Sequence, residues 1–184
     1  MNPVELDLSV WTIGHSTRPI DEFVAALASF SIGALVDVRT YPGSRRYPHF
    51  NKPTLAASLA GVEIEYRHVP ELGGRRRAKP DSLNMAWRNE MFRGYADHME
   101  TEEFREGIDW LLGFARESRT AIMCAEAVWW KCHRSLIADY LKAKGVRVLH
   151  ILGEGKAEEH PFTGAARIVN GQLSYRGVLD AAGD

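Results

Sequence analysis

The chain has 184 residues, of which 45% are hydrophobic, so it is long enough for one domain with a substantial core. No apolar run approaches the roughly 20 residues that cross a bilayer, and the first ten residues lack the basic and long apolar regions of a signal peptide. Two cysteines are too few for a disulfide framework. We therefore expect a single cytoplasmic domain over residues 1–184, with free thiols and no membrane partner.

The net charge of −1 conceals an uneven distribution of charge. Residues 39–93 contain eleven Lys or Arg and five Asp or Glu, a local balance of about +6. Arginine also outnumbers lysine by 17 to 6, and its planar fork suits phosphate and carboxylate groups. The basic third is either a solvated surface or a site for an anionic small molecule or nucleic acid.

The first seventy residues favour strands alternating with helices. Residues 8–14 (LSVWTIG) and 34–38 (ALVDV) are compact apolar runs typical of buried strands. Between them a helix is predicted to begin at Pro19, followed by apolar residues at helical spacing. This strand-helix-strand order favours parallel pairing. A basic, aromatic loop at 40–52 leads to a short helix and an alternating strand, predicted over 53–60 and 63–69.

The rest of the chain continues the alternation. Residues 70–82 (PELGGRRRAKPDS) form an irregular basic loop, which we interpret as a mobile lid or a linker within the domain. The predicted elements that follow are helices at 85–99 and 102–117, a strand at 120–124, a helix at 135–144 and a strand at 146–152. Asn170-Gly171 indicates a hairpin. We therefore predict an α/β domain with a mostly parallel sheet flanked by helices, and a C-terminal β-hairpin.

In a parallel sheet, ligands bind beyond the carboxyl ends of the strands. This rule selects four segments: residues 14–17, 39–51, the loop after Val69, and 124–134. The residues that look chemically active all lie in these segments, which is the best evidence for function in the sequence.

The stretch CAEAVWWKCHRS (124–135) joins a strand end to a helix start. Amide groups at a helix N-terminus hold anions and lower the pKa of a nearby thiol. Cys124 and Cys132 are candidate nucleophiles, and Glu126 and His15 are candidate acids or bases.

Four interpretations of the cysteines stay open. They are inert buried thiols, an attacking and a resolving thiol, a metal site that also uses His133 and His15, or a structural disulfide. The spacing C-x7-C-H is not a recognised zinc pattern, and cytosolic disulfides are rare, so the last two are the weaker interpretations. No cofactor is required by the sequence, and we assign no metal ligands.

A second group of candidates would bind an anionic substrate. It combines arginines, hydroxyls, an aromatic ring and a histidine at the strand ends: Arg39, Arg134, Ser135, Ser16, Asp37, Arg45, Arg46, Tyr41 and His133. Arginine and aromatic residues interleaved over 41–50 suit phosphate contact and base stacking, although a polar loop packed on a sheet edge has the same composition.

Five blocks of the sequence resemble the signature blocks of the DUF488 family. They are TIGHSTRPIDEFVAAL, LVDVRTYPGSRRYPHFN, HVPELGG, MCAEAVWWKCHRSLIADYL and VLHI. The resemblance covers nearly the whole chain, including the tail HPFTGAARIVNGQLSY, without a departure from the pattern. The family's function is uncharacterised, so no residue role is carried over. Its characteristic positions correspond to His15, Ser16, Asp37, Arg39, Pro42, Cys124, Glu126, Cys132, His133 and Arg134.

LVDVR is also similar to the strand that opens rhodanese-like domains, whose catalytic Cys precedes an Arg by five intervening residues. Here nine residues separate Cys124 from Arg134 and one separates Cys132 from it, so neither cysteine fits.

Our leading hypothesis is therefore an enzyme with a Cys/Arg/His site at the strand ends that acts on a phosphate-bearing or nucleic-acid-derived substrate. The alternatives are a non-enzymatic nucleic-acid-binding module with structural cysteines, and a Cys/His metal-binding protein. The sequence leaves the oligomeric state open.

Overall fold

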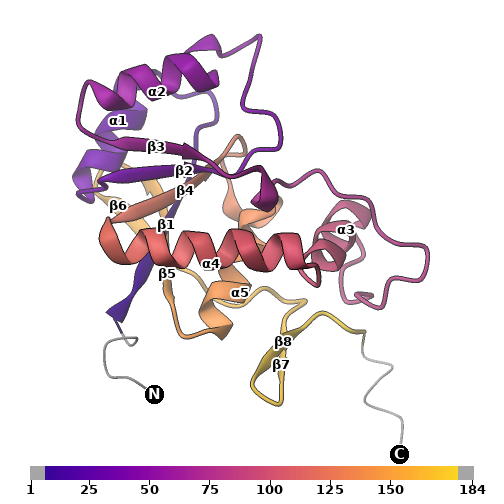
Figure 1. The fold of residues 1–184 in the computed structure, drawn as a ribbon. Helices are drawn as coiled ribbons and strands as arrows, with labels where there is room; N and C mark the ends of the chain where they lie inside the picture. The colour runs from indigo at the N-terminus through magenta and orange to yellow at the C-terminus, as the bar shows by residue number, and fades with distance from the viewer. Residues whose placement is uncertain (1–6, 178–184) are drawn as a thin grey trace, which may run out of the picture.

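The computed structural model describes residues 7–177. The ends of the predicted domain, and the first six residues of the segment examined for a signal peptide, lie outside this range. A six-stranded sheet in the order β3-β2-β4-β1-β5-β6 forms the centre of the protein (Figure 1). Its strands are β1 (Ser9–Gly14), β2 (Ala34–Asp37), β3 (Glu65–His68), β4 (Thr120–Cys124), β5 (Arg147–Gly153) and β6 (Lys156–Glu159). All pairings are parallel except the one between β5 and β6.

Helices lie on both faces of this sheet (Figure 1). They are α1 (Ile20–Ser29), α2 (Lys52–Ala60), α3 (Glu90–His98), α4 (Glu102–Glu117) and α5 (Arg134–Ala143). Of these, α3 lies beyond the end of α4, away from the strands (Figure 1). Single 3-10 turns occur at Pro48–Phe50, Pro70–Leu72 and Trp129–Lys131. The tail forms an antiparallel hairpin of β7 (Arg167–Val169) and β8 (Gln172–Ser174) around Asn170-Gly171. The predicted fold class is confirmed.

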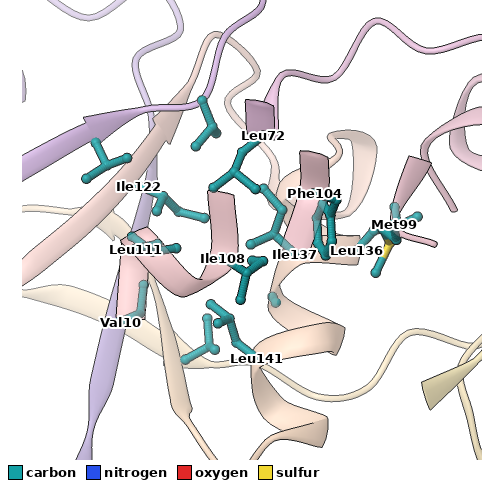
Figure 2. Packing of buried hydrophobic residues seen from close by; sticks show 14 of the residues in the cluster. Val10, Leu72, Met99, Phe104, Ile108, Leu111, Ile122, Leu136, Ile137 and Leu141 are labelled. Atoms are coloured by element: carbon teal, nitrogen blue, oxygen red, sulfur yellow. The ribbon is translucent and has the colours of Figure 1, made fainter. Parts of the chain in front are cut away.

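The buried side chains form one apolar cluster on each face of the sheet. Phe23 and Leu27 of α1 and Leu55 and Leu59 of α2 belong to the first cluster. The second joins α3, α4 and α5 to the other face, and Figure 2 shows its labelled side chains from α4 and α5 gathered beside those of β1 and β4. Each large side chain buried in this way contributes about 1.5–3 kcal/mol. Both clusters therefore fix the sheet whose strand ends carry the site.

The sheet order differs from the simple pairing that the first strand-helix-strand unit suggests. β1 and β2 are parallel, but β4 lies between them and pairs with both. The partner that separates them comes some 80 residues later, so local sequence does not reveal it. In the resulting register Gly14 lies beside Cys124, and Asp37 beside Met123. This register brings the ends of β1, β2 and β4 together.

Two predicted segments differ from the structure. The helix predicted over 85–99 begins only at Glu90, because the Asn89 side chain accepts the backbone N–H groups of Met91 and Phe92 and caps it there. The segment 70–82 starts with the 3-10 turn Pro70–Leu72 and continues as a coil that hydrogen-bonds to α3. Its Lys79 N–H and Ser82 hydroxyl donate to Asp97, whose side chain is buried. The edge strand β6 was not predicted, since its four residues are all exposed and show no alternation.

No helix in the described part of the chain is both long enough and apolar enough to cross a membrane.

Candidate functional site

A cavity of about 600 Å³ opens at the carboxyl ends of the parallel strands. Its wall draws on all four of the segments selected from the sequence: the β1–α1 loop, the loop after β2, Gly74 and Arg75, and the segment from Cys124 to His133. Met91 and Phe92 of α3 complete it. Two other hollows, each of about 660 Å³, contain no cysteine.

Both cysteines lie at the wall of this cavity. Cys124 ends β4, and Cys132 precedes α5 by two residues. Their thiols are free, and the two Sγ atoms are 2.6 Å apart. The exposed fractions of the residues are only 3% and 6%. The loop between them is held tightly against β1, since a Cβ at Gly14 would lie 1.8 Å from the carbonyl oxygen of Glu126. A side chain at position 14 would therefore displace the segment that carries the thiols.

Arg134 lies beneath the thiols and is almost fully buried, with 1% of its surface exposed. Its Nε donates to Cys124 Sγ at 3.0 Å, and its backbone N–H donates to Cys132 Sγ at 3.4 Å. Nη2 donates to the carbonyl oxygen of Glu126 at 2.7 Å, and Nη1 to the hydroxyl of Thr12 at 3.1 Å. Within residues 7–177, no carboxylate accepts a hydrogen bond from this guanidinium. The thiols are therefore the acidic groups that Arg134 contacts.

The two thiols differ in acidity. Burial opposes ionisation of both, and it raises the pKa of Cys124 well above its ordinary value. For Cys132 the penalty of burial is outweighed by hydrogen bonds from the Cys124 thiol and from Arg134, together with the positive charge of Arg134, which lower its pKa to about 7. We therefore assign the negative charge of the pair to Cys132, with the Cys124 S–H donating to it.

His133 follows Cys132 directly in the chain and is held as a neutral ring. Burial lowers the pKa of its imidazole. Nε2 lies 2.9 Å from the carbonyl oxygen of Val38, so Nε2 carries the proton and donates it. Nδ1 then carries no proton; it lies 3.5 Å from Cys132 Sγ, where it can accept from a thiol but gives no hydrogen bond to a thiolate. Gly74 packs on this ring so closely that a Cβ there would lie 2.4 Å from Nδ1.

Arg39 forms a second cationic element of the cavity wall. Asp37 accepts from it in a bidentate geometry, with Nε to Oδ1 at 2.9 Å and Nη2 to Oδ2 at 2.7 Å. The hydroxyl of Tyr66 donates to the same Oδ2 at 2.5 Å. Asp37 is fully buried and does not reach the cavity, so it orients Arg39 and is not placed to touch a ligand. Nη1 of Arg39 points to His15.

His15 lines the cavity as a second neutral imidazole. Burial lowers its pKa to about 4, reinforced by the positive charge of Arg39. Nδ1 lies 2.9 Å from the carbonyl oxygen of Ser16 and donates to it, so Nε2 is the acceptor that faces Arg39 Nη1 at 3.4 Å. The ring stacks on Phe50 with centroids 4.3 Å apart. His15 is therefore an ordered acceptor near neutral pH.

The remaining predicted site residues divide into three groups. Ser16 and Glu126 line the cavity, as does Tyr41, which is 69% exposed with the Arg75 guanidinium over its ring. Ser135 does not, because it is fully buried and its hydroxyl donates to the carbonyl oxygen of Cys132 at 2.8 Å. Arg45 and Arg46 are exposed on the preceding loop, outside the cavity wall. The structure thus places part of the predicted set in the cavity wall and the rest outside it.

In the part of the chain that the structure describes, no three His, Cys, Asp or Glu side chains are arranged to hold a metal ion. The two ring nitrogens of His15 contact Ser16 and Arg39, so His15 does not form a set of metal ligands with the cysteines.

A protein-family model, described as "Domain of unknown function DUF488", matches residues 19–141. The chain belongs to the DUF488 family. Searches of curated proteins and of solved structures found no match. The match contains Asp37, Arg39, both cysteines and Arg134, whereas His15 lies just outside it.

Sequence reasoning missed a buried chain of hydrogen bonds that ends at Arg134 and lies partly outside the DUF488 match. Thr12 Oγ1 lies 2.6 Å from His150 Nδ1, His150 Nε2 lies 2.9 Å from His160 Nδ1, and His160 Nε2 lies 2.8 Å from Asp139 Oδ1. All four residues are buried, with exposed fractions of 1% or less. Their positions in sequence, 12, 139, 150 and 160, have no recognisable spacing, so only the fold reveals the chain.

The direction of this chain follows from its two ends. The carboxylate of Asp139 is an acceptor, so His160 Nε2 donates and His160 Nδ1 accepts from His150. His150 Nδ1 then accepts from the Thr12 hydroxyl, whose lone pairs are left for Arg134 Nη1. Arg134 and the carboxylate of Asp139 are thus joined by a chain of hydrogen bonds in which every donor points towards Asp139.

Proposed function

We propose that this DUF488 protein is an enzyme in which Cys132 acts as a nucleophile on an anionic substrate. The observation that carries the proposal is the buried Arg134: its guanidinium donates to the Cys124 thiol and its backbone N–H to Cys132 Sγ, while among the described residues the guanidinium donates to no carboxylate. A buried cation is stable only beside an anion. A thiolate at Cys132 supplies that anion and is the reactive form of cysteine.

The surrounding groups would support this chemistry in separate ways. The Cys124 S–H and the amide of Arg134 stabilise the Cys132 thiolate. Glu126 is exposed at the cavity wall, where its carboxyl group would exchange protons with substrate or solvent. His15 and His133 are neutral acceptors that would orient polar groups of the substrate.

The cavity wall favours an anion. Its charged lining side chains are Arg39, Arg75 and Lys131 against Glu126, and because Asp37 neutralises Arg39, the positive charges that face a ligand are those of Arg75 and Lys131. A volume of about 600 Å³ suits a small molecule. We therefore propose a substrate with phosphate or carboxylate groups that Arg75 and Lys131 bind.

The proposal is tested by the pH dependence of alkylation of the reduced protein by iodoacetamide. We expect a rate that titrates near pH 7 in the wild-type protein and is lost in Cys132→Ser. A wild-type profile that follows an unperturbed thiol, near pH 8.5, would contradict it. Inorganic pyrophosphate should slow alkylation, less so in the double variant Arg75→Met/Lys131→Met. Arg45→Met is the matched control, because Arg45 lies outside the cavity wall.

The competing nucleic-acid-binding hypothesis makes a different prediction. It requires oligonucleotide affinity that falls steeply with salt and that Arg45→Met/Arg46→Met weakens, with Cys132→Ser neutral. That combination of results, with normal thiol titration, would replace our proposal.

A further inference from the structure

We infer that the reaction is thiol–disulfide exchange on a small anionic disulfide, in which Cys132 attacks and Cys124 resolves. The inference rests on the proposed role of Cys132 as nucleophile and adds the reaction class and the substrate class.

The first argument is the position of Cys124. Its sulfur lies 2.6 Å from Cys132 Sγ, closer than any other reactive side chain of the cavity. A second thiol beside a nucleophile is useful when the atom to be attacked next is the nucleophile's own sulfur. That condition holds for a mixed disulfide at Cys132, whereas an acyl or phosphoryl intermediate is resolved at carbon or phosphorus.

The second argument is that Arg134 can stabilise a thiolate first at Cys132 and then at Cys124. Its backbone N–H reaches Cys132 Sγ, and its guanidinium Nε reaches Cys124 Sγ at 3.0 Å. While Cys132 is a thiolate, Cys124 stays protonated as its hydrogen-bond donor. Once Cys132 has formed a covalent bond it is neutral, so the buried cation then favours ionisation of Cys124. The same charge therefore activates the resolving thiol only after the first step.

The reaction balances in two exchanges. The Cys132 thiolate attacks one sulfur of R–S–S–R, which forms a Cys132–S–R bond and releases RS⁻. The proton of Cys124 passes to this released thiolate, and the Cys124 sulfur attacks Cys132 Sγ, which forms the Cys124–Cys132 disulfide and releases the second RS⁻. Two electrons pass from the protein dithiol to the substrate disulfide. A thiol reductant returns them by exchange in the opposite direction.

The third argument concerns the size and charge of the substrate. Both sulfurs lie at a cavity wall with exposed fractions of 3% and 6%, so the disulfide has to enter the cavity to reach them. This requirement favours a small molecule over a disulfide on a folded protein surface. Arg75 and Lys131 favour carboxylate or phosphate groups on it.

The test uses the full-length reduced protein and three probes that differ in charge: 5,5′-dithiobis(2-nitrobenzoate), which is anionic, 4,4′-dithiodipyridine, which is neutral, and cystamine, which is cationic. Each rate is divided by the rate of the same probe with N-acetylcysteine. We expect the normalised rates to fall from the anionic to the cationic probe by tenfold or more. The wild-type protein should release two probe thiols per chain and finish as an internal disulfide without adduct mass. Cys124→Ser should release one and retain one adduct.

Each outcome decides a separate point. A wild-type protein that reacts rapidly at Cys132 but keeps the adduct overturns the resolving role of Cys124, and the proposed nucleophile stands. A cystamine rate equal to or above that of the anionic probe overturns the substrate class. Reaction at Cys132 no faster than that of N-acetylcysteine with all three probes, together with normal iodoacetamide titration, overturns the proposed function itself. Cys132→Ser, which leaves Cys124 in place, shows which thiol reacts first.

Discussion

Two buried arginines lie near the same cavity, Arg39 in its wall and Arg134 against the two thiols of the wall, and their positive charges are balanced in different ways. Arg39 is 6% exposed and held by a bidentate carboxylate, Asp37, with a further donor to that carboxylate from Tyr66. Arg134 is 1% exposed and donates to a thiol, a hydroxyl and carbonyl oxygens. The first arrangement is an ion pair that is complete without a ligand.

In the arrangement around Arg134, the positive charge is balanced only when a neighbouring thiol ionises. Carboxylates ionise readily, so the charge of Arg39 is neutralised at any physiological pH. A thiol ionises only near or above neutrality, so the state of the Arg134 site depends on pH and on what is bonded to sulfur. Under our proposal, a buried arginine marks a reactive site when its neighbours are weakly acidic nucleophiles, and a structural one when they are carboxylates.

The largest effect should follow from breaking the complete ion pair. Asp37→Asn removes the negative charge but leaves the Arg39 guanidinium buried, which costs about 3–5 kcal/mol of unfolding free energy. The measurement is equilibrium denaturation in urea. Tyr66→Phe is the matched control, because it removes one hydrogen bond to the same carboxylate and should cost about 1 kcal/mol. Equal losses in the two variants would show that the ion pair is not what stabilises this side of the cavity.

The second effect is a dependence of stability on pH that belongs to the thiol pair. The pKa of Cys132 is lowered to about 7 in the folded protein, against roughly 8.5 in an unfolded chain. Between pH 7 and pH 8.5 the unfolded state binds more protons than the folded state, so the free energy of unfolding rises with pH by about 2 kcal/mol. This contribution is lost as the pH falls through 7. The pKa of Cys124 is raised by burial, so stability should fall above pH 8.5.

Denaturation midpoints from pH 7 to pH 9.5 would measure this curve. Histidine has an ordinary pKa near 6.5, so its titration contributes little in this range. The rise between pH 7 and 8.5 should vanish in Cys132→Ala. A rise that persists in that variant belongs to other groups.

The third effect separates the role of Arg134 from that of Arg39. In Arg134→Met the thiol loses its cation, so the pKa of Cys132 should rise by at least one unit and alkylation at pH 7 should slow about tenfold or more. Stability should fall less than in Asp37→Asn, since the thiols can stay protonated and no buried charge is left without a partner. Arg134→Lys keeps a positive charge but not the planar fork, so its alkylation rate at pH 7 should lie between those of the wild-type protein and Arg134→Met. An unchanged alkylation profile in Arg134→Met would remove the basis of the comparison.

The smallest effect tests the buried chain from Thr12 to Asp139. Thr12→Val keeps the shape of the side chain but removes the acceptor of Arg134 Nη1. We expect a shift of the Cys132 alkylation midpoint by less than one pH unit, because the other contacts of Arg134 remain. Thr12→Ser, which restores the hydroxyl, should return the wild-type midpoint. Equal behaviour of the valine and serine variants would limit the chain to a structural role.

The sequence by itself determined most of the local structure and predicted the edge of the sheet at which the candidate site lies. The helix over 102–117 and the strand over 120–124 agree with the observed bounds, and Asn170-Gly171 marks the observed hairpin. These features follow from side-chain periodicity, capping and turn chemistry, which act over a few residues. The rule that ligands bind at strand ends located the cavity because parallel strands share one direction.

Only the tertiary structure decided which of those residues meet. The insertion of β4 between β1 and β2 places Cys124 beside Gly14, and the packing of α5 turns Arg134 inward to the sulfurs while Arg45 faces solvent. Both arginines follow predicted strand ends or helix starts, so their local sequence does not distinguish them. Burial and charge balance among residues distant in the chain made the difference, and these depend on the order of strands in the sheet.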